Sequence, residues 1–182
     1  MLPSILAAIA VSVILAGLTL WAFSARRRLA ALDENSGNAL CQLGVQLSAR
    51  FDALMALLEL AKGYAADMAG NFSQSITAKR SPITAKSSPE DVIRQELVIA
   101  YALVCIGAIT EKYPAFTADP AYTKAMDAVQ TFEGMVRTSR LLYNDSVTKL
   151  NREIRLFPVS MVALICGLPQ RAYLEEWAAH KS

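Results

Sequence analysis

The start of the chain, from Leu2 to Ala25, is mostly apolar and contains no charged residue. An uncharged run of about 20 residues is what an α-helix needs to cross the hydrocarbon layer of a membrane. Trp21 lies near the end of this run and three arginines, 26–28, follow it, as is typical of a membrane–water interface. The pattern predicts that residues 1–25 form a transmembrane anchor, which contacts the lipid bilayer through residues 2–25.

A cleaved signal peptide is the alternative for this segment. Such a peptide begins with a positively charged region, and no charge precedes Arg26. An uncleaved, single-pass anchor is therefore the better interpretation. Positive charges beside a span tend to stay in the cytoplasm. Because the arginines follow the span, we expect the N-terminus outside and the rest of the chain on the cytoplasmic side.

Beyond the anchor, apolar residues recur at alternating steps of three and four, the heptad pattern of a helix in a bundle or coiled coil. Before this pattern, residues 26–38 form a basic juxtamembrane connector. Its polar end, 34–38, predicts a break, with Ser36 or Asn35 capping a new helix. Arg50 is the one charged member of the stripe, which consists of Leu40, Leu43, Leu47, Arg50, Leu54, Leu57, Ala61, Tyr64 and Met68.

The heptad pattern stops at residues 69–89, which are rich in Ser, Thr, Pro and Lys and predict a loop. A helix resumes after Ser88, an N-cap residue, with Pro89 in its first position. From Leu97 to Ile109 this helix is apolar nearly all round, which predicts the most buried helix of the bundle. That apolar run is too short for a second membrane span.

A third long helix is predicted to begin after Asp119, as cap, and to end at Pro158. The apolar residues 159–168 follow as a turn or short helix, and Tyr173, Leu174 and Trp177 are candidate docking residues of the C-terminal segment. Two members of the third stripe are charged; it consists of Tyr122, Met126, Val129, Glu133, Val136, Arg140, Tyr143, Val147, Leu150, Ile154 and Phe157.

No segment alternates apolar and polar residues with the period of a strand, so we expect an all-α protein. Its N-terminal transmembrane helix would be followed by an elongated antiparallel bundle of three to four long helices. The bundle would occupy residues 39–176, with the loop at 69–89, and residues 177–182 would form a tail. In an up–down–up arrangement, the first and third long helices would run parallel.

Polar residues lie on or beside these stripes. At about 1.5 Å per residue, Arg50 and Glu133 each lie roughly 20 Å from the start of their helices, so we expect them to pair. Arg140 is expected to pair with Glu59, Asp52 or a loop carbonyl. Such pairs set helix register more than they add stability, although a partner-binding groove is the alternative. The whole predicted network consists of Gln46, Arg50, Asp52, Glu59, Glu133, Arg140, Tyr143, Asn144 and Asn151.

Composition narrows the function further. The net charge is only +2, so nucleic-acid binding has no electrostatic support. The three cysteines form no CxxC pair, so we expect buried small residues rather than a zinc site or disulfides. The single histidine, His180, lies near the C-terminus, and no Glu-x-x-His pattern of a di-iron bundle is present. We therefore expect no catalytic, metal-binding or cofactor-binding residues.

The motifs of residues 46–65, 111–122 and 133–168, followed by "RAYLE", resemble the LemA family of membrane-anchored helical proteins. Four family positions differ here: Leu40 replaces a tryptophan, Met55-Ala56 a Pro-Asn pair and Leu150 a tyrosine. The residues that carry the resemblance are Gln46, Leu47, Arg50, Asp52, Lys62, Gly63, Tyr64, Ala65, Tyr113, Pro114, Glu133, Arg140, Tyr143, Asn144, Asn151, Phe157 and Pro158.

The resemblance implies a single anchor, a helical bundle and no established enzymatic activity; some relatives are implicated in organising specialised bacterial membranes. We expect a non-enzymatic scaffold or interaction module at the bacterial inner membrane, acting on an unidentified protein partner. Small residues in the anchor leave homo-oligomerisation open. The alternative function is a membrane-bound enzyme or accessory subunit with a small polar cleft around Arg140, Tyr143 and Asn144.

Overall fold

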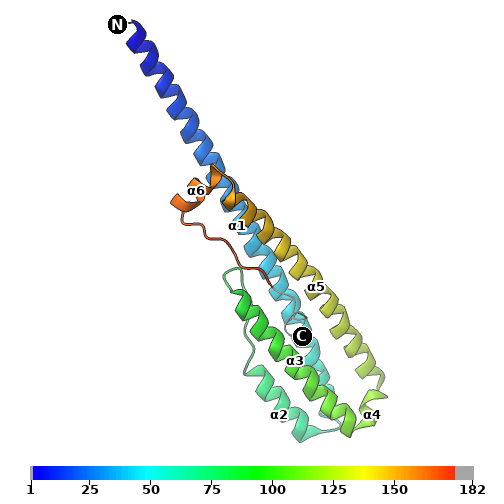
Figure 1. Cartoon of the computed structure of the whole chain (residues 1–182). Helices are drawn as coiled ribbons and strands as arrows, with labels where there is room; N and C mark the ends of the chain where they lie inside the picture. Colours follow the sequence, from blue (N-terminus) through cyan, green and yellow to red (C-terminus); the bar gives the residue numbers. More distant parts are fainter. Residues whose placement is uncertain (1, 175–182) are drawn as a thin grey trace, which may run out of the picture. The chain divides into compact units, whose positions relative to one another are not determined.

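The computed structural model describes residues 2–174, and this part of the chain is helical, with turns and irregular connections but no strand. The all-α prediction is therefore confirmed for these residues. The helices, labelled in Figure 1, are α1 (Leu2–Ala61), α2 (Ala66–Thr77), α3 (Pro89–Lys112), α4 (Pro114–Thr117), α5 (Pro120–Arg155) and α6 (Val159–Ile165).

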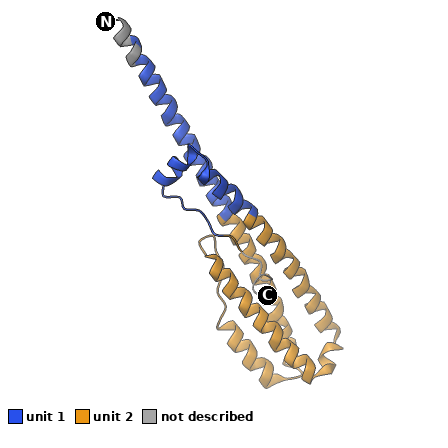
Figure 2. Ribbon diagram, viewed as in Figure 1, with its two compact units in different colours: residues 1–36, 145–172 blue, residues 37–144, 173–182 orange. Residues whose placement is uncertain are grey.

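The chain forms two compact units, coloured separately in Figure 2. Unit 1 comprises residues 1–36 and 145–172, and unit 2 comprises residues 37–144 and 173–182. The long helices α1 and α5 each contribute residues to both units. Unit 2 holds most of the predicted polar network, and unit 1 holds the predicted anchor.

Unit 2 is a helical bundle in which α1 and α5 run antiparallel. Arg50 of α1 contacts Glu133 of α5, whereas Tyr64, later in the chain, contacts Asp119, which lies before α5. The numbering thus rises along one helix as it falls along the other. Our expectation of parallel first and third helices was wrong, because α2 adds a reversal between them that the sequence pattern did not predict.

Leucines of α1 and aliphatic residues of α3 and α5 fill the core of unit 2. This packing confirms most of the heptad positions, because the apolar face of each helix is covered by its neighbours. The fully or nearly fully buried residues include Leu40, Leu43, Leu47, Leu54 and Leu57 of α1, Val92, Ile99, Ala102, Ile106 and Ile109 of α3, and Val129, Val136 and Tyr143 of α5.

The predicted loop at 69–89 is partly helix. Residues up to Thr77 belong to α2, which buries Ala69 and Ile76, and only 78–88 is irregular. That irregular segment passes close to Gly44 of α1: a Cβ on Gly44 would lie 2.5 Å from the carbonyl oxygen of Ile83. Glycine is therefore required there by the close approach of two backbones.

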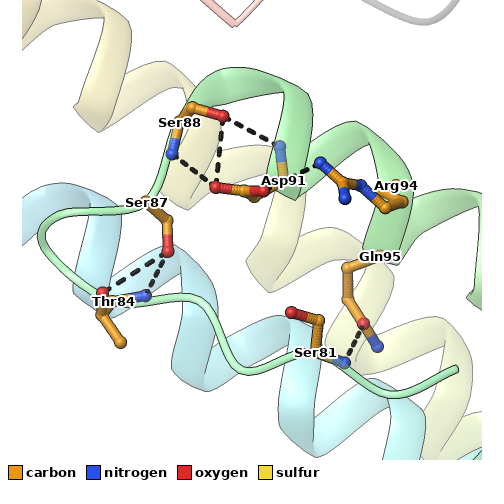
Figure 3. A network of polar contacts seen from close by, with 7 residues as sticks. All are labelled: Ser81, Thr84, Ser87, Ser88, Asp91, Arg94 and Gln95. Atoms are coloured by element: carbon orange, nitrogen blue, oxygen red, sulfur yellow. Dashed lines mark hydrogen bonds and ion pairs between the residues drawn. The ribbon is translucent and has the colours of Figure 1, made fainter. Parts of the chain in front are cut away.

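The start of α3 confirms the predicted cap. Ser88 Oγ accepts the N–H of Asp91, and the Asp91 carboxylate accepts the N–H of Ser88, which completes a capping box (Figure 3). Gln95, nearly fully buried, accepts the N–H of Ser81 through Oε1 at 2.9 Å. These bonds fix the irregular segment to the first turns of α3. Asp119 likewise accepts the N–H of Ala121 at the start of α5, at 2.8 Å, as predicted.

The predicted break at 34–38 does not occur, since α1 is continuous from Leu2 to Ala61. Ser36 is fully buried, and its hydroxyl donates to the carbonyl of Asp33 at 2.7 Å. A serine that bonds its own preceding turn in this way fits inside a helix. The cap residues of the connector therefore serve as ordinary helical positions.

Unit 1 has a small core of its own where α6 packs against α1. Ala25, Leu29, Val162 and Ala163 are buried together. Partly buried apolar residues complete this cluster: Ala22, Ile154, Val159 and Leu168. Gly167, with a φ of +65°, ends the turn after α6 in the left-handed conformation that favours glycine. The prediction of a turn or short helix at 159–168 is confirmed.

Two helices of the described chain are long and apolar enough to cross a membrane. In the apolar window of α1, 6% of the residues are buried, whereas in that of α3 the share is 44%. Burial identifies α3 as a core helix of unit 2, while the apolar side chains of α1 from Ile9 to Leu20 are exposed. The structure thus agrees with α1 as the candidate membrane span.

The cysteines differ from expectation. Cys105 is buried, but Cys41 and Cys166 are exposed free thiols, so the prediction of three buried cysteines was wrong for two of them. In the C-terminal segment, Leu174 is buried and Tyr173 is exposed. Trp177 and His180 lie outside the described residues.

Candidate functional site

The predicted pair between Arg50 and Glu133 is present. Arg50 Nη2 lies 2.9 Å from Glu133 Oε2, with 13% and 50% of the two side chains exposed. The Nε of Arg50 is buried and has no hydrogen-bond partner among the described residues. Arg50 is therefore largely withdrawn from water, whereas its carboxylate partner remains half in solvent, an arrangement that adds little net stability but ties α1 to α5.

Arg140 pairs with a residue that was not among its predicted partners. Its guanidinium contacts the carboxylate of Glu96 on α3, and only 13% and 14% of these side chains are exposed. The expected partners are engaged elsewhere: Asp52 pairs with Arg80 and Glu59 with Lys62. The Arg140–Glu96 pair is the most buried ion pair of the described chain, so it is costly to break from one side.

Asn144 binds backbone rather than another side chain. Its Nδ2 donates to the carbonyl of Leu174, and its Oδ1 accepts the N–H of Leu174, both at 2.9 Å. Leu174 itself is buried. One asparagine in unit 2 thus satisfies both backbone groups of a residue that lies in neither helix nor strand.

Asn151 does the same in unit 1. Its Nδ2 donates to the carbonyl of Arg171 and its Oδ1 accepts the N–H of Arg171, both at 2.9 Å. The guanidinium of Arg171 then contacts Asp33 of α1 at 2.7 Å. A further bond, 2.8 Å long, joins Arg155 of α5 to the amide oxygen of Gln170. Together these contacts hold the segment after α6 against α1 and α5.

We call each such pair of bonds an asparagine clasp. The two asparagines are seven residues apart on α5, and their partners are three residues apart in a non-helical segment. Asn144 and Asn151 were predicted only as members of the polar network, and the bonds described above join their side chains to the C-terminal segment.

The remaining predicted residues take simpler roles. Tyr143 is almost completely buried in the core. Gln46 lies half-buried on α1, one turn before Arg50, and is not part of the contacts above. Asp52 and Glu59 lie on exposed ion pairs of unit 2. The structure therefore joins the predicted residues to different partners instead of gathering them into one cluster.

An aromatic cluster at the α4 end of unit 2 was not predicted. Phe116 is fully buried, and the rings of Tyr64 and Tyr122 lie 5.3 and 4.9 Å from its ring centroid. The Tyr64 hydroxyl donates to Asp119, and this bond raises the pKa of Tyr64 above its ordinary value. The signal was available in sequence, because both motifs, "KGYA" and "YPAFTADPAY", sit where helices end.

A second tyrosine has a raised pKa for a comparable reason. Tyr101 of α3 is hydrogen-bonded to Cys105, one turn later, and this contact raises its pKa. Burial in turn raises the pKa of the Cys105 thiol. A thiol with a raised pKa is a poor nucleophile, so this pair favours packing over chemistry.

The ion pairs and asparagine side chains of the polar network are chemically suited to holding helices in register. Within residues 2–174, no three His, Cys, Asp or Glu side chains gather in a way that could hold a metal ion. The cationic groups of the network face carboxylates, and the amide groups of Asn144 and Asn151 face backbone. These contacts fix α1, α3 and the C-terminal segment to α5.

Comparison with known families gives a match to the bundle and the C-terminal segment. The sequence pattern of the LemA family matches residues 39–182, which include every residue of the polar network. No curated protein matches the chain.

Proposed function

Since the chain belongs to the LemA family, we propose that it is a non-enzymatic helical scaffold tethered to the bacterial inner membrane by α1. In this proposal the bundle of unit 2 lies on the cytoplasmic side, where it presents an interaction surface to a protein partner. The α1 window that could cross a membrane supports the tether, and the arginines at 26–28 support this orientation.

The observation that carries the non-enzymatic part is the state of Arg140. The alternative, an enzyme or accessory subunit with a polar cleft around Arg140, Tyr143 and Asn144, needs a guanidinium that reaches a substrate. Instead, Arg140 contacts Glu96 with little of either side chain exposed, and Asn144 is occupied by the backbone of Leu174. Because these polar groups are already bonded within the bundle, they support a structural role for the network.

The surface left for a partner is the outer face of the bundle. On α5, Leu141 and Leu142 are more than half exposed, and on α3 the same holds for Val104. Contiguous exposed apolar surface marks sites of protein–protein interaction, and these side chains are the candidates for such a surface on the bundle. These positions, and not the seam residues, are where we expect contact with a protein partner.

The test is photocrosslinking of the full-length protein in its native membrane, with the crosslinker at position 141, beside the same protein carrying Arg140→Met and Glu96→Leu. We expect a discrete crosslinked partner that the folded double variant retains. If the double variant stays folded but loses the partner, the seam residues line a binding groove and the structural role is wrong. If a small molecule rather than a protein is captured, the result supports the enzyme alternative and contradicts the scaffold.

The native cysteines test the orientation. Cys41 is an exposed thiol of unit 2, and Cys105 is buried and serves as an internal control. A membrane-impermeant maleimide applied to intact cells should leave Cys41 unlabelled, and permeabilisation of the inner membrane should expose it. Labelling of Cys41 in intact cells, with a Cys41→Ser control, would place the bundle on the opposite side.

A further inference from the structure

The segment around α6 exposes more apolar surface than the rest of unit 1 outside the candidate span. Phe157, Leu164 and Ile165 are each more than four-fifths exposed, at 81%, 83% and 84%. Leu156 and Met161 are also about half exposed. We call these five side chains the α6 patch. A helix that is apolar on the face it turns to water is unusual for a soluble protein.

The position of Phe157 shows how this surface arises. The heptad pattern of α5 predicts Phe157 as a buried position of the third stripe, and that prediction was wrong. The helix α5 ends at Arg155, so the register of the stripe is lost two residues before Phe157. Its ring therefore faces outward, together with those side chains of α6 that do not contact α1.

The opposite side of α6 fixes where this patch lies. Val162 and Ala163 are buried against Ala25 and Leu29 of α1. Ala25 is the last residue of the uncharged run, and Arg26 begins the basic cluster. The α6 patch is thus attached to α1 at the place where a membrane-spanning α1 would leave the hydrocarbon layer.

The charges of the same region match a membrane surface. Residues 22–29 and 152–168 contain a single acidic residue, Glu153, which pairs with Arg28 at 2.8 Å. The other arginines of these two segments, Arg26, Arg27, Arg152 and Arg155, are all exposed. Basic residues beside an apolar surface are attracted to anionic lipid headgroups. A bilayer therefore suits both the apolar patch and its surroundings.

We propose that the α6 patch inserts into the interfacial layer of the membrane, as a second lipid contact beside the anchor. The exposed side chains of residues 156–165 lie among headgroups and upper acyl chains, while Val162 and Ala163 stay on α1. The C-terminal end of α5 is then held at the membrane surface. This inference rests on the proposed anchoring through α1, and its test separates the two.

The test uses tryptophan fluorescence of the full-length chain in vesicles of phosphatidylethanolamine and phosphatidylglycerol with brominated acyl chains, which quench nearby tryptophan. In a Trp21→Phe, Trp177→Phe background, Leu164→Trp reports on the patch. A matched probe, Leu141→Trp, sits at an exposed apolar position of α5 in unit 2. A third protein keeps Trp21 and carries only Trp177→Phe, so that it reports on the anchor.

We expect the Leu164→Trp probe to show a blue shift and a loss of fluorescence on bromination, and the Leu141→Trp probe to show neither. A quenched Trp21 with an unquenched Leu164→Trp probe would overturn the α6 proposal and leave the anchor intact. If Trp21 is also unquenched, the anchor itself is wrong. A blue shift that depends on protein concentration and not on bromination would assign the patch to a second copy of the chain, and so overturn the lipid contact.

Discussion

Arg140 of α5 and Glu96 of α3 form an ion pair in which only 13% and 14% of the side chains are exposed. Each therefore compensates a charge that the bundle has largely removed from water. Removal of one partner leaves the other buried without its counter-charge, which typically costs about 3 to 5 kcal/mol. Replacement of both by apolar residues of similar size removes the problem.

We expect Arg140→Met alone and Glu96→Leu alone to destabilise unit 2 by about 3 to 5 kcal/mol, and the double variant to lose much less. The measurement is chemical denaturation of the purified full-length protein in detergent. The exposed pair of Lys149 and Asp145 serves as control, since breaking it should cost no more than about 1 kcal/mol. Additive losses at Arg140 and Glu96 would contradict the coupling.

The Arg50–Glu133 pair could be predicted from the sequence, but the direction of the two helices that carry it could not. The pair was predicted correctly, but from helices assumed to be parallel. Arg50 lies eleven residues before the end of α1 and Glu133 thirteen residues after the start of α5, so the two also meet when the helices are antiparallel. Heptad spacing predicts which faces are buried, but it carries no information about helix direction.

Partners outside the stripes could not be predicted in this way. Glu96 flanks an apolar run and looks like a surface residue in sequence, and Leu174 and Arg171 offer only backbone groups to the asparagines. Backbone partners leave no trace in side-chain chemistry. Caps, in contrast, depend on neighbours in sequence, and the predicted roles of Ser88 and Asp119 are confirmed.

The asparagine clasps should be separable. Asn151→Leu keeps a similar volume but leaves the N–H and carbonyl of Arg171 without partners, a loss of about 1 to 3 kcal/mol. Hydrogen exchange at the Arg171 amide should accelerate strongly, while the Leu174 amide stays protected by Asn144. Asn144→Leu should do the reverse. Arg152→Leu, an exposed neighbour on α5, should change neither amide, and equal exchange in all three variants would contradict the clasp.

The capping box of α3 should make stability depend on acid pH. Asp91 accepts hydrogen bonds from the backbone N–H and the hydroxyl of Ser88, and these bonds hold its pKa below the ordinary value of 3.8. A carboxyl whose pKa is lowered by folding stabilises the folded state above its ordinary pKa, and this contribution is lost as the pH falls through the lower, folded value.

Asp91→Asn should therefore lower the melting temperature most at neutral pH, and the difference from the unmodified protein should shrink as the pH falls below 3.8. Thermal unfolding followed by circular dichroism across this range gives the measurement. Glu90→Gln removes a neighbouring acidic charge without touching the box and is the control. Ser88→Ala should cost about 1 kcal/mol, and a constant effect of Asp91→Asn at every pH would show that the box does not titrate.

Two glycines of the bundle should respond oppositely to alanine. At Gly44 a new Cβ would lie 2.5 Å from the Ile83 carbonyl oxygen and 2.9 Å from the Ile83 Cβ, and the first of these atoms is backbone that cannot rotate away. Gly44→Ala should therefore cost about 1 to 3 kcal/mol and push residues 78–88 away from α1.

At Gly134 of α5, in contrast, a Cβ meets nothing within 4 Å, so Gly134→Ala should stabilise the helix by about 0.5 to 1 kcal/mol. Denaturation of both variants, with proteolysis in the 78–88 segment as a local probe, tests this; a neutral Gly44→Ala with an unchanged cleavage rate would mean that the segment does not close on α1.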